Sequence, residues 1–134
     1  MPAMRYRLPL IALFLVAGCG GNSPAAPSAP PPIPSATIQS AGNSQWITCL
    51  TIINTCTFQA EVRNAGPGCA ANVRGVTRFY DAVDQVVGTF NWTTGGGTMR
   101  RDESFVYSIP GVPLNTAQRT TTYQTVPSWD NVRC

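Results

Sequence analysis

The amino-acid sequence predicts an antiparallel β-sandwich of about seven short strands, placed behind an N-terminal export signal and a proline-rich linker. Three observations lead to this fold class. Residues 37–134 are rich in Thr and Val, turn residues recur about every ten residues, and no stretch places apolar residues at helical spacing. This part of the chain is long enough for one modest hydrophobic core. We therefore expect a single all-β domain.

The export signal is predicted by residues 1–18. They contain a basic start with Arg5 and Arg7, an apolar run over residues 8–16 and small residues at the end, which are the three parts of a secretory signal peptide. The apolar run is shorter than the about 20 residues that a membrane-spanning helix needs. We therefore expect the protein to be exported without spanning the membrane.

Cys19 is the candidate site of lipid attachment. The sequence Val16-Ala17-Gly18-Cys19 resembles the lipobox of bacterial lipoproteins. This implies that Cys19 becomes the first mature residue and carries a diacylglyceryl thioether, usually with an amide-linked third chain. Two or three acyl chains anchor a protein stably, whereas one is marginal. The membrane is thus the expected partner, through Cys19, and a plain signal peptide or an apolar anchor ending there is the alternative.

The residue after the lipobox bears on the destination. Residue 20, directly after the lipobox cysteine, is Gly. In some enterobacterial lipoproteins an Asp at this position is the signal for retention in the inner membrane, and that signal is missing here. The resemblance therefore implies a lipid-anchored, extracytoplasmic protein of the bacterial cell envelope, with the outer membrane as the expected site if the organism has one.

Residues 19–36 are predicted to form a linker. After Cys19 this segment consists almost entirely of Pro, Ala, Ser and Gly, so it should stay solvated and partly in polyproline II. At up to ~3.1 Å per residue it would be a semi-rigid spacer. A proline-rich recognition motif is the alternative.

The predicted strands follow one another through residues 37–134. The clearest covers residues 56–63, where apolar and polar residues alternate, so one face is core and the other solvated. Residues 72–81 have apolar side chains on both faces, which predicts a more central strand. The other expected strands cover residues 45–49, 85–92, 103–109, 117–126 and 129–133. Turn residues separate them at 66–68, 81–84, 95–97 and 110–113.

Four short motifs between Phe58 and Tyr107 resemble the FxLYD-type immunoglobulin-like domains of bacterial lipoproteins. They are Val62-Arg63-Asn64, the strand 73–81 that ends in Phe-Tyr-Asp, the segment 86–89 with sequence Val-Val-Gly-Thr, and Glu103-Ser104-Phe105. The resemblance implies an immunoglobulin-like sandwich in an extracytoplasmic setting. It implies no reaction.

Four cysteines lie in the predicted domain: Cys49, Cys56, Cys69 and Cys134. An even number in a small exported domain favours two disulfides, for which three pairings exist. We predict Cys49 with Cys56, across a hairpin, and Cys69 with Cys134, which would close nearly the whole domain. Metal or redox chemistry is the alternative, but the chain has no C-x-x-C spacing and no His.

The composition excludes most catalytic devices. All nine basic residues are Arg, and the chain has neither Lys nor His, so the commonest general base, the commonest metal ligand and all lysine chemistry are missing. Once the signal is removed, seven Arg and six acidic residues remain, and no basic cluster is larger than Arg100-Arg101. We therefore expect no enzyme, no cofactor, no metal and no nucleic-acid partner.

Acidic side chains offer two weak candidate sites. Asp81 and Asp84 bracket a turn and could hold calcium, but a calcium site needs six to eight oxygens, so we expect turn formers. Asp102 and Glu103 could be half of a glycosidase pair, but neighbouring residues on a strand point to opposite faces.

The aromatic residues leave two functions open. Trp46, Trp92 and Trp129 could form an exposed platform for a sugar or a protein partner, although most large aromatic residues of a small sandwich belong to its core. Our first hypothesis is a non-catalytic envelope lipoprotein that acts as a structural or protein-binding module, its envelope partner unknown. The alternative is a carbohydrate-binding module that uses those aromatic side chains.

Overall fold

The computed structural model describes Gly21 and residues 24–134. The chain divides into two units, Met1–Pro30 and Pro31–Cys134, and all helices and strands of the described residues lie in the second. Residues 24–30 are exposed and have no regular secondary structure. The predicted signal segment and Cys19 lie outside the described residues.

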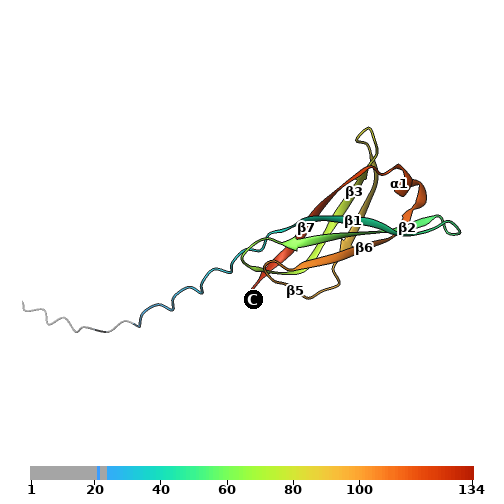
Figure 1. Cartoon of the computed structure of the whole chain (residues 1–134). Coiled ribbons are helices and arrows are strands. Elements are labelled where there is room, and N and C mark those ends of the chain that lie inside the picture. Colours follow the sequence, from blue (N-terminus) through green and yellow to red (C-terminus); the bar gives the residue numbers. More distant parts are fainter. Residues whose placement is uncertain (1–20, 22–23) are drawn as a thin grey trace, which may run out of the picture. The chain divides into compact units, whose positions relative to one another are not determined.

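Seven strands form two antiparallel sheets that pack face to face, which confirms the predicted all-β sandwich (Figure 1). The first sheet has the order β1-β2-β6, with β1 at Ile38–Leu50, β2 at Thr55–Asn64 and β6 at Ser104–Pro113. In the second sheet β3 (Cys69–Tyr80) is central. It pairs with β4 (Val86–Thr93), β5 (Thr98–Met99) and β7 (Thr122–Val132). A short helix α1 (Leu114–Arg119) connects β6 to β7.

Strand β2 has the alternation that the sequence predicts. Its even-numbered residues from Cys56 to Asn64 are buried, and the odd-numbered residues lie towards solvent. In β3 the same alternation holds from Val73 onwards. It arises because one face of each sheet is covered by the other sheet and the opposite face is solvated.

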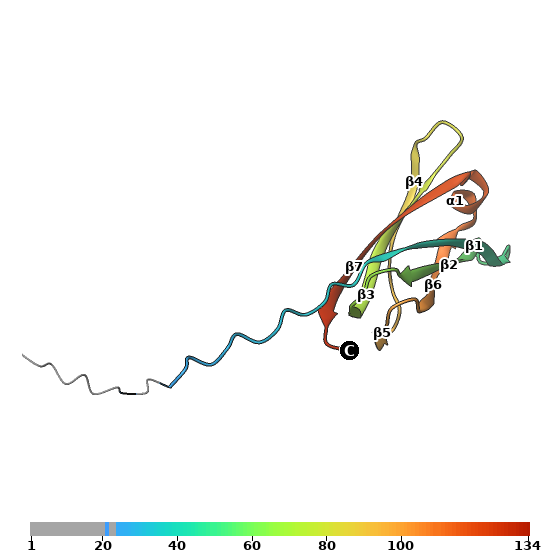
Figure 2. The ribbon, with the colours of Figure 1, turned by 60° about the vertical axis from the view of Figure 1, so that its left-hand side comes forward.

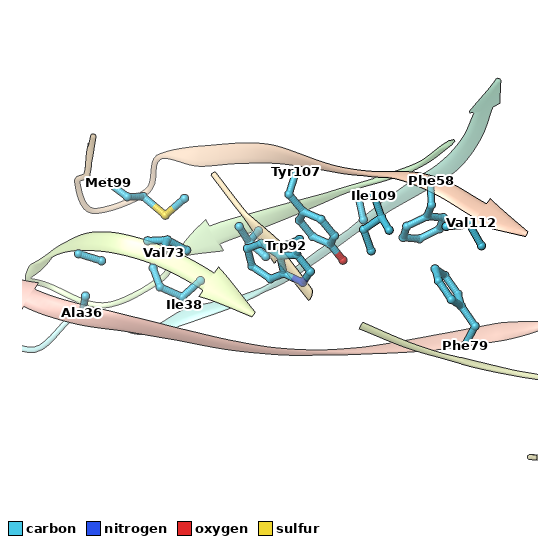
Figure 3. Close-up of a cluster of buried hydrophobic side chains, with 13 residues drawn as sticks. Ala36, Ile38, Phe58, Val73, Phe79, Trp92, Met99, Tyr107, Ile109 and Val112 are labelled. Atoms are coloured by element: carbon cyan, nitrogen blue, oxygen red, sulfur yellow. The ribbon is translucent and has the colours of Figure 1, made fainter. Parts of the chain in front are cut away.

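The core lies between the sheets and is mostly aromatic and aliphatic (Figure 3). Trp92 of β4 stacks on Tyr107 of β6, with ring centroids 4.0 Å apart. Gly75 makes this stack possible, because a Cβ atom there would lie 2.5 Å from Trp92 Cζ2. The Tyr107 hydroxyl is hydrogen bonded to Thr77 and Thr125. One polar network therefore joins the two sheets inside an apolar core.

The C-terminal region differs from the prediction. Instead of strands at 117–126 and 129–133, the chain forms α1 and then one continuous strand β7. Helix α1 is short and buries only Thr116, so it has no apolar periodicity to detect. Pro127, where we expected a break, lies within β7. It is tolerated there because β7 is an edge strand, paired only with β3.

The first strand is also longer than predicted. β1 starts seven residues before the expected 45–49 segment, and its register shifts twice, between Ser40 and Ser44 and between Trp46 and Thr48. Such irregularities interrupt the alternation of faces. The apolar pattern of β1 is therefore hidden in the sequence.

Candidate functional site

The end of the predicted linker is fastened to one end of the sandwich. Ser35 accepts a hydrogen bond from the Gly68 N–H at 3.1 Å, and the Ala36 N–H donates to Asn131 at 2.8 Å. Ala36 itself is buried in the core. We call this end of the sandwich, formed by residues 34–37, 64–69 and 131–134, the base.

Asn64 organises the base. Its side chain is fully buried, and its Oδ1 accepts hydrogen bonds from the N–H groups of Thr37 and Gly66, both at 3.0 Å. Its Nδ2 donates to the carbonyl oxygens of Gly68 and Met99. Every polar group of this buried amide is thus satisfied. One residue joins the linker end, the β2–β3 turn and β5.

Two glycines give the linker end its place. A Cβ atom on Gly66 would lie 2.5 Å from the Thr37 nitrogen, and one on Gly68 would overlap the Pro34 carbonyl group. Real Cβ atoms do not approach backbone this closely, so both positions need glycine. The sequence predicts only a turn at these glycines, whereas in the structure they also make room for residues 34–37.

The Cys69–Cys134 disulfide closes the base. Its two cysteines are 65 residues apart in sequence, and Cys69 is fully buried. This is the predicted pairing. Because it joins the first residue of β3 to the last residue of the chain, it ties the C-terminus to the strand that follows the linker contact.

The Cys49–Cys56 disulfide closes the β1–β2 hairpin at the other end of the sandwich, again as predicted. The two cysteines are register partners with Cα atoms 4.0 Å apart. Beyond them lie residues 50–54, which we call the tip. In both ribbon views the hairpin protrudes at the end opposite the C-terminus (Figures 1 and 2).

The tip exposes large aliphatic side chains. Ile52 is 95% exposed, Ile53 60% and Leu50 50%. Sequence reasoning missed this feature. The available signal was an aliphatic run inside a short turn between two bonded cysteines, where there is no space for a core.

The three tryptophans do not assemble the predicted platform. Trp92 is only 5% exposed, and its Nε1 atom has no hydrogen-bond partner among the described residues. Trp46 and Trp129 are half-buried and pack against the core. The expectation for Trp92 was wrong because its indole is needed to fill the space between the sheets above Gly75.

The acidic candidates are turn residues. Two N–H groups, of Val83 and Gln85, donate to the Asp81 carboxylate, and Arg119 is 3.1 Å from it. These contacts lower the pKa of Asp81, chiefly through the Gln85 hydrogen bond. Asp84 and Asp102 have positive φ angles of 59° and 64°, as tight turns require. Within the described residues, no three His, Cys, Asp or Glu side chains come together as a possible metal site.

An open depression of about 420 Å³ lies on the outer face of the first sheet, beside the bulge in β1. Asn43 donates to Glu61 at 2.6 Å there, and this bond is the main cause of the lowered pKa of the Glu61 carboxyl. Gln59, on the same face, is bonded to Ser108. Three polar side chains that line this depression, Asn43, Gln59 and Glu61, are therefore already engaged in hydrogen bonds within the protein.

Comparison with known proteins finds no match, whether with family models, curated proteins or solved structures. Among the described residues, no helix is long and apolar enough to cross a membrane. The two disulfides favour an extracytoplasmic domain, since such bonds persist in oxidising compartments.

Proposed function

We propose that the protein is a membrane-anchored lipoprotein of the bacterial cell envelope, and that its sandwich is a non-catalytic structural or protein-binding module. The observation that carries the proposal is the fastened linker end. Because residues 34–37 are hydrogen bonded into the base, an acylated Cys19 would hold the domain by one fixed end. The opposite end, with its stapled tip, would be free to meet a partner.

The immunoglobulin-like classification is part of this proposal. The order β1-β2-β6 faces a second sheet in which β3 is flanked by β4 and β7, and the chain changes sheets after β2 and again before and after β6. Seven antiparallel strands in two such layers are typical of the immunoglobulin fold. The motifs around Asn64 and Tyr80 support the same assignment.

A non-catalytic role is supported by how the carboxylates are used. Asp81, Asp102 and Asp130 each lie within 4.0 Å of an Arg side chain, and Glu61 and Glu103 accept hydrogen bonds from neighbouring groups. Acid-base catalysis needs a carboxyl group poised near the working pH in a cleft. Carboxylates that are paired with Arg or accept hydrogen bonds on turns and outer faces do not meet that requirement.

Intact mass spectrometry of the protein purified from membranes tests the proposal. We expect an N-terminal acylated Cys19, and a gain of two hydrogens for each disulfide on reduction. The matched control is Cys19→Ala, which should release the protein from membranes and keep both disulfides. A wild-type chain with an unmodified Cys19 would contradict the lipid anchor.

A further inference from the structure

The tip differs from the rest of the surface in its chemistry. Three large aliphatic side chains, Leu50, Ile52 and Ile53, lie on one short turn and are half to fully exposed. In the rest of the described chain the exposed large apolar residues are spread out: one in the linker (Ile33), one in a turn (Val83), and one on each of the strands β1, β4, β6 and β7 (Ile47, Val86, Val106 and Val126). Clustered exposed aliphatic side chains mark a binding surface, whereas isolated ones are ordinary.

The tip is also held in one shape. The disulfide joins Cys49 to Cys56, one residue pair below the last paired residues, Leu50 and Thr55. The Leu114 N–H donates to the Asn54 carbonyl oxygen at 2.8 Å, which fixes the turn to the start of α1. A turn that is already ordered loses little conformational entropy when it binds.

No charge accompanies the tip. The chain has no acidic or basic residue between positions 8 and 60. On the neighbouring helix α1 the charged side chain is Arg119, and it is paired with Asp81 at 3.1 Å. Moving a charged side chain into hydrocarbon is costly, whereas Ile and Leu enter it favourably. The tip can therefore enter an apolar medium without desolvating an ion.

The composition and shape of the tip distinguish between two kinds of partner. Sites that dominate protein–protein affinity are rich in Trp, Tyr and Arg and poor in Leu and Val. The tip contains only aliphatic and small uncharged polar side chains, on a turn that protrudes from the sandwich (Figure 2). From this we infer that the tip inserts Leu50, Ile52 and Ile53 into the interfacial layer of a lipid bilayer.

This inference extends the proposed function, because it gives the free end of an anchored domain a lipid contact of its own. The test uses the full chain, purified from membranes and reconstituted into phosphatidylcholine–phosphatidylethanolamine vesicles. An environment-sensitive fluorescent amino acid replaces Ile52 in one preparation and Val126 in a matched control. We expect a blue shift, and quenching by brominated acyl chains, at position 52 and not at position 126.

Adding Ile53→Asp to the chain labelled at position 52 should lower the inserted fraction by about tenfold or more, whereas adding Val126→Asp should leave it unchanged. Each preparation is checked for an intact Cys49–Cys56 bond by mass, so a misfolded hairpin is not scored. Equal solvation at positions 52 and 126 in vesicles overturns the inference. So does a blue shift at position 52 that requires envelope proteins and is absent in pure lipid, because it would show a protein pocket instead.

The same samples separate this inference from the lipid anchor, since the mass of Cys19 reports acylation independently. An acylated chain with a solvated tip overturns the inference alone. An unacylated chain whose tip still enters vesicles supports the inference and contradicts the anchor.

Discussion

The base and the tip of the sandwich each contain a disulfide, and almost everything around those two bonds differs. At the base, Cys69 is buried, and the buried Asn64 side chain makes four hydrogen bonds. Two glycines there leave room for the end of the linker. At the tip, the Cys49–Cys56 bond holds a turn with exposed isoleucines and no core beneath it. The comparison teaches that the base is held by many mutually dependent contacts, whereas the tip depends largely on one covalent bond.

Replacing Asn64 should have the largest effect. Asn64→Ala leaves two N–H groups and two carbonyl oxygens of the base without partners. At about 1–3 kcal/mol for each buried unsatisfied group, we expect a loss of about 4 kcal/mol or more. Urea unfolding under oxidising conditions measures it. Asn43→Ala, which removes one exposed hydrogen bond, should cost less than about 1 kcal/mol; similar losses for the two variants would refute the importance of the base.

Removing each disulfide in turn compares the two ends directly. Cys69→Ser with Cys134→Ser opens a loop of 65 residues and Cys49→Ser with Cys56→Ser one of 7. Chain entropy then predicts losses of about 4 and about 2 kcal/mol. Thermal unfolding gives both values. We further expect that loss of the Cys49–Cys56 bond speeds amide exchange only in the hairpin. A larger loss of stability on removing Cys49–Cys56 than on removing Cys69–Cys134 would show that the tip is the more constrained end.

Gly68→Ala tests the linker contact. The new methyl group would overlap the Pro34 carbonyl group, so residues 34–36 must move, at about 1–3 kcal/mol. Hydrogen exchange should show loss of protection at Ala36 and unchanged protection in the hairpin. Ile52→Asp is the counterpart at the tip and should change stability by no more than about 0.5 kcal/mol. Unchanged exchange at Ala36 in Gly68→Ala would mean that the linker is not fastened there.

The smallest expected effect is on the pH dependence of the melting temperature, when Asp81 is replaced by Asn. Asp81 lies beyond the end of β3 that is distant from Cys69, and hydrogen bonds hold its pKa below the ordinary value of 3.8. A carboxyl whose pKa is lower in the folded state stabilises the fold above its unfolded pKa, and this contribution is lost as the pH falls through the folded value. The melting temperature of Asp81→Asn should therefore depend less on pH below about 4 than that of the wild type. Parallel pH profiles would contradict this assignment.

The sequence revealed those features that depend on local pattern. Alternation in β2 predicted its faces, and cysteine spacing predicted both disulfides. The two-residue strand β5 and the helix α1 are too short to leave a periodic signal. The linker contact could not be predicted, because the sequence does not distinguish a glycine that leaves room for another segment from a glycine that only forms a turn. The tip was missed because the exposed Ile52 and the buried Ile109 are the same residue type, and only the tertiary structure determines which of them is buried.

Strand β1 begins at the base and ends at the tip, and this has a mechanical consequence. If tension is applied to the linker while the tip is held, it runs through the covalent backbone of β1, over its 13 residues, or about 40 Å at strand spacing. Strands β2 to β7 then lie beside the loaded path. The two register shifts in β1 provide slack that can straighten first, so the protein could transmit force from end to end while its core stays folded.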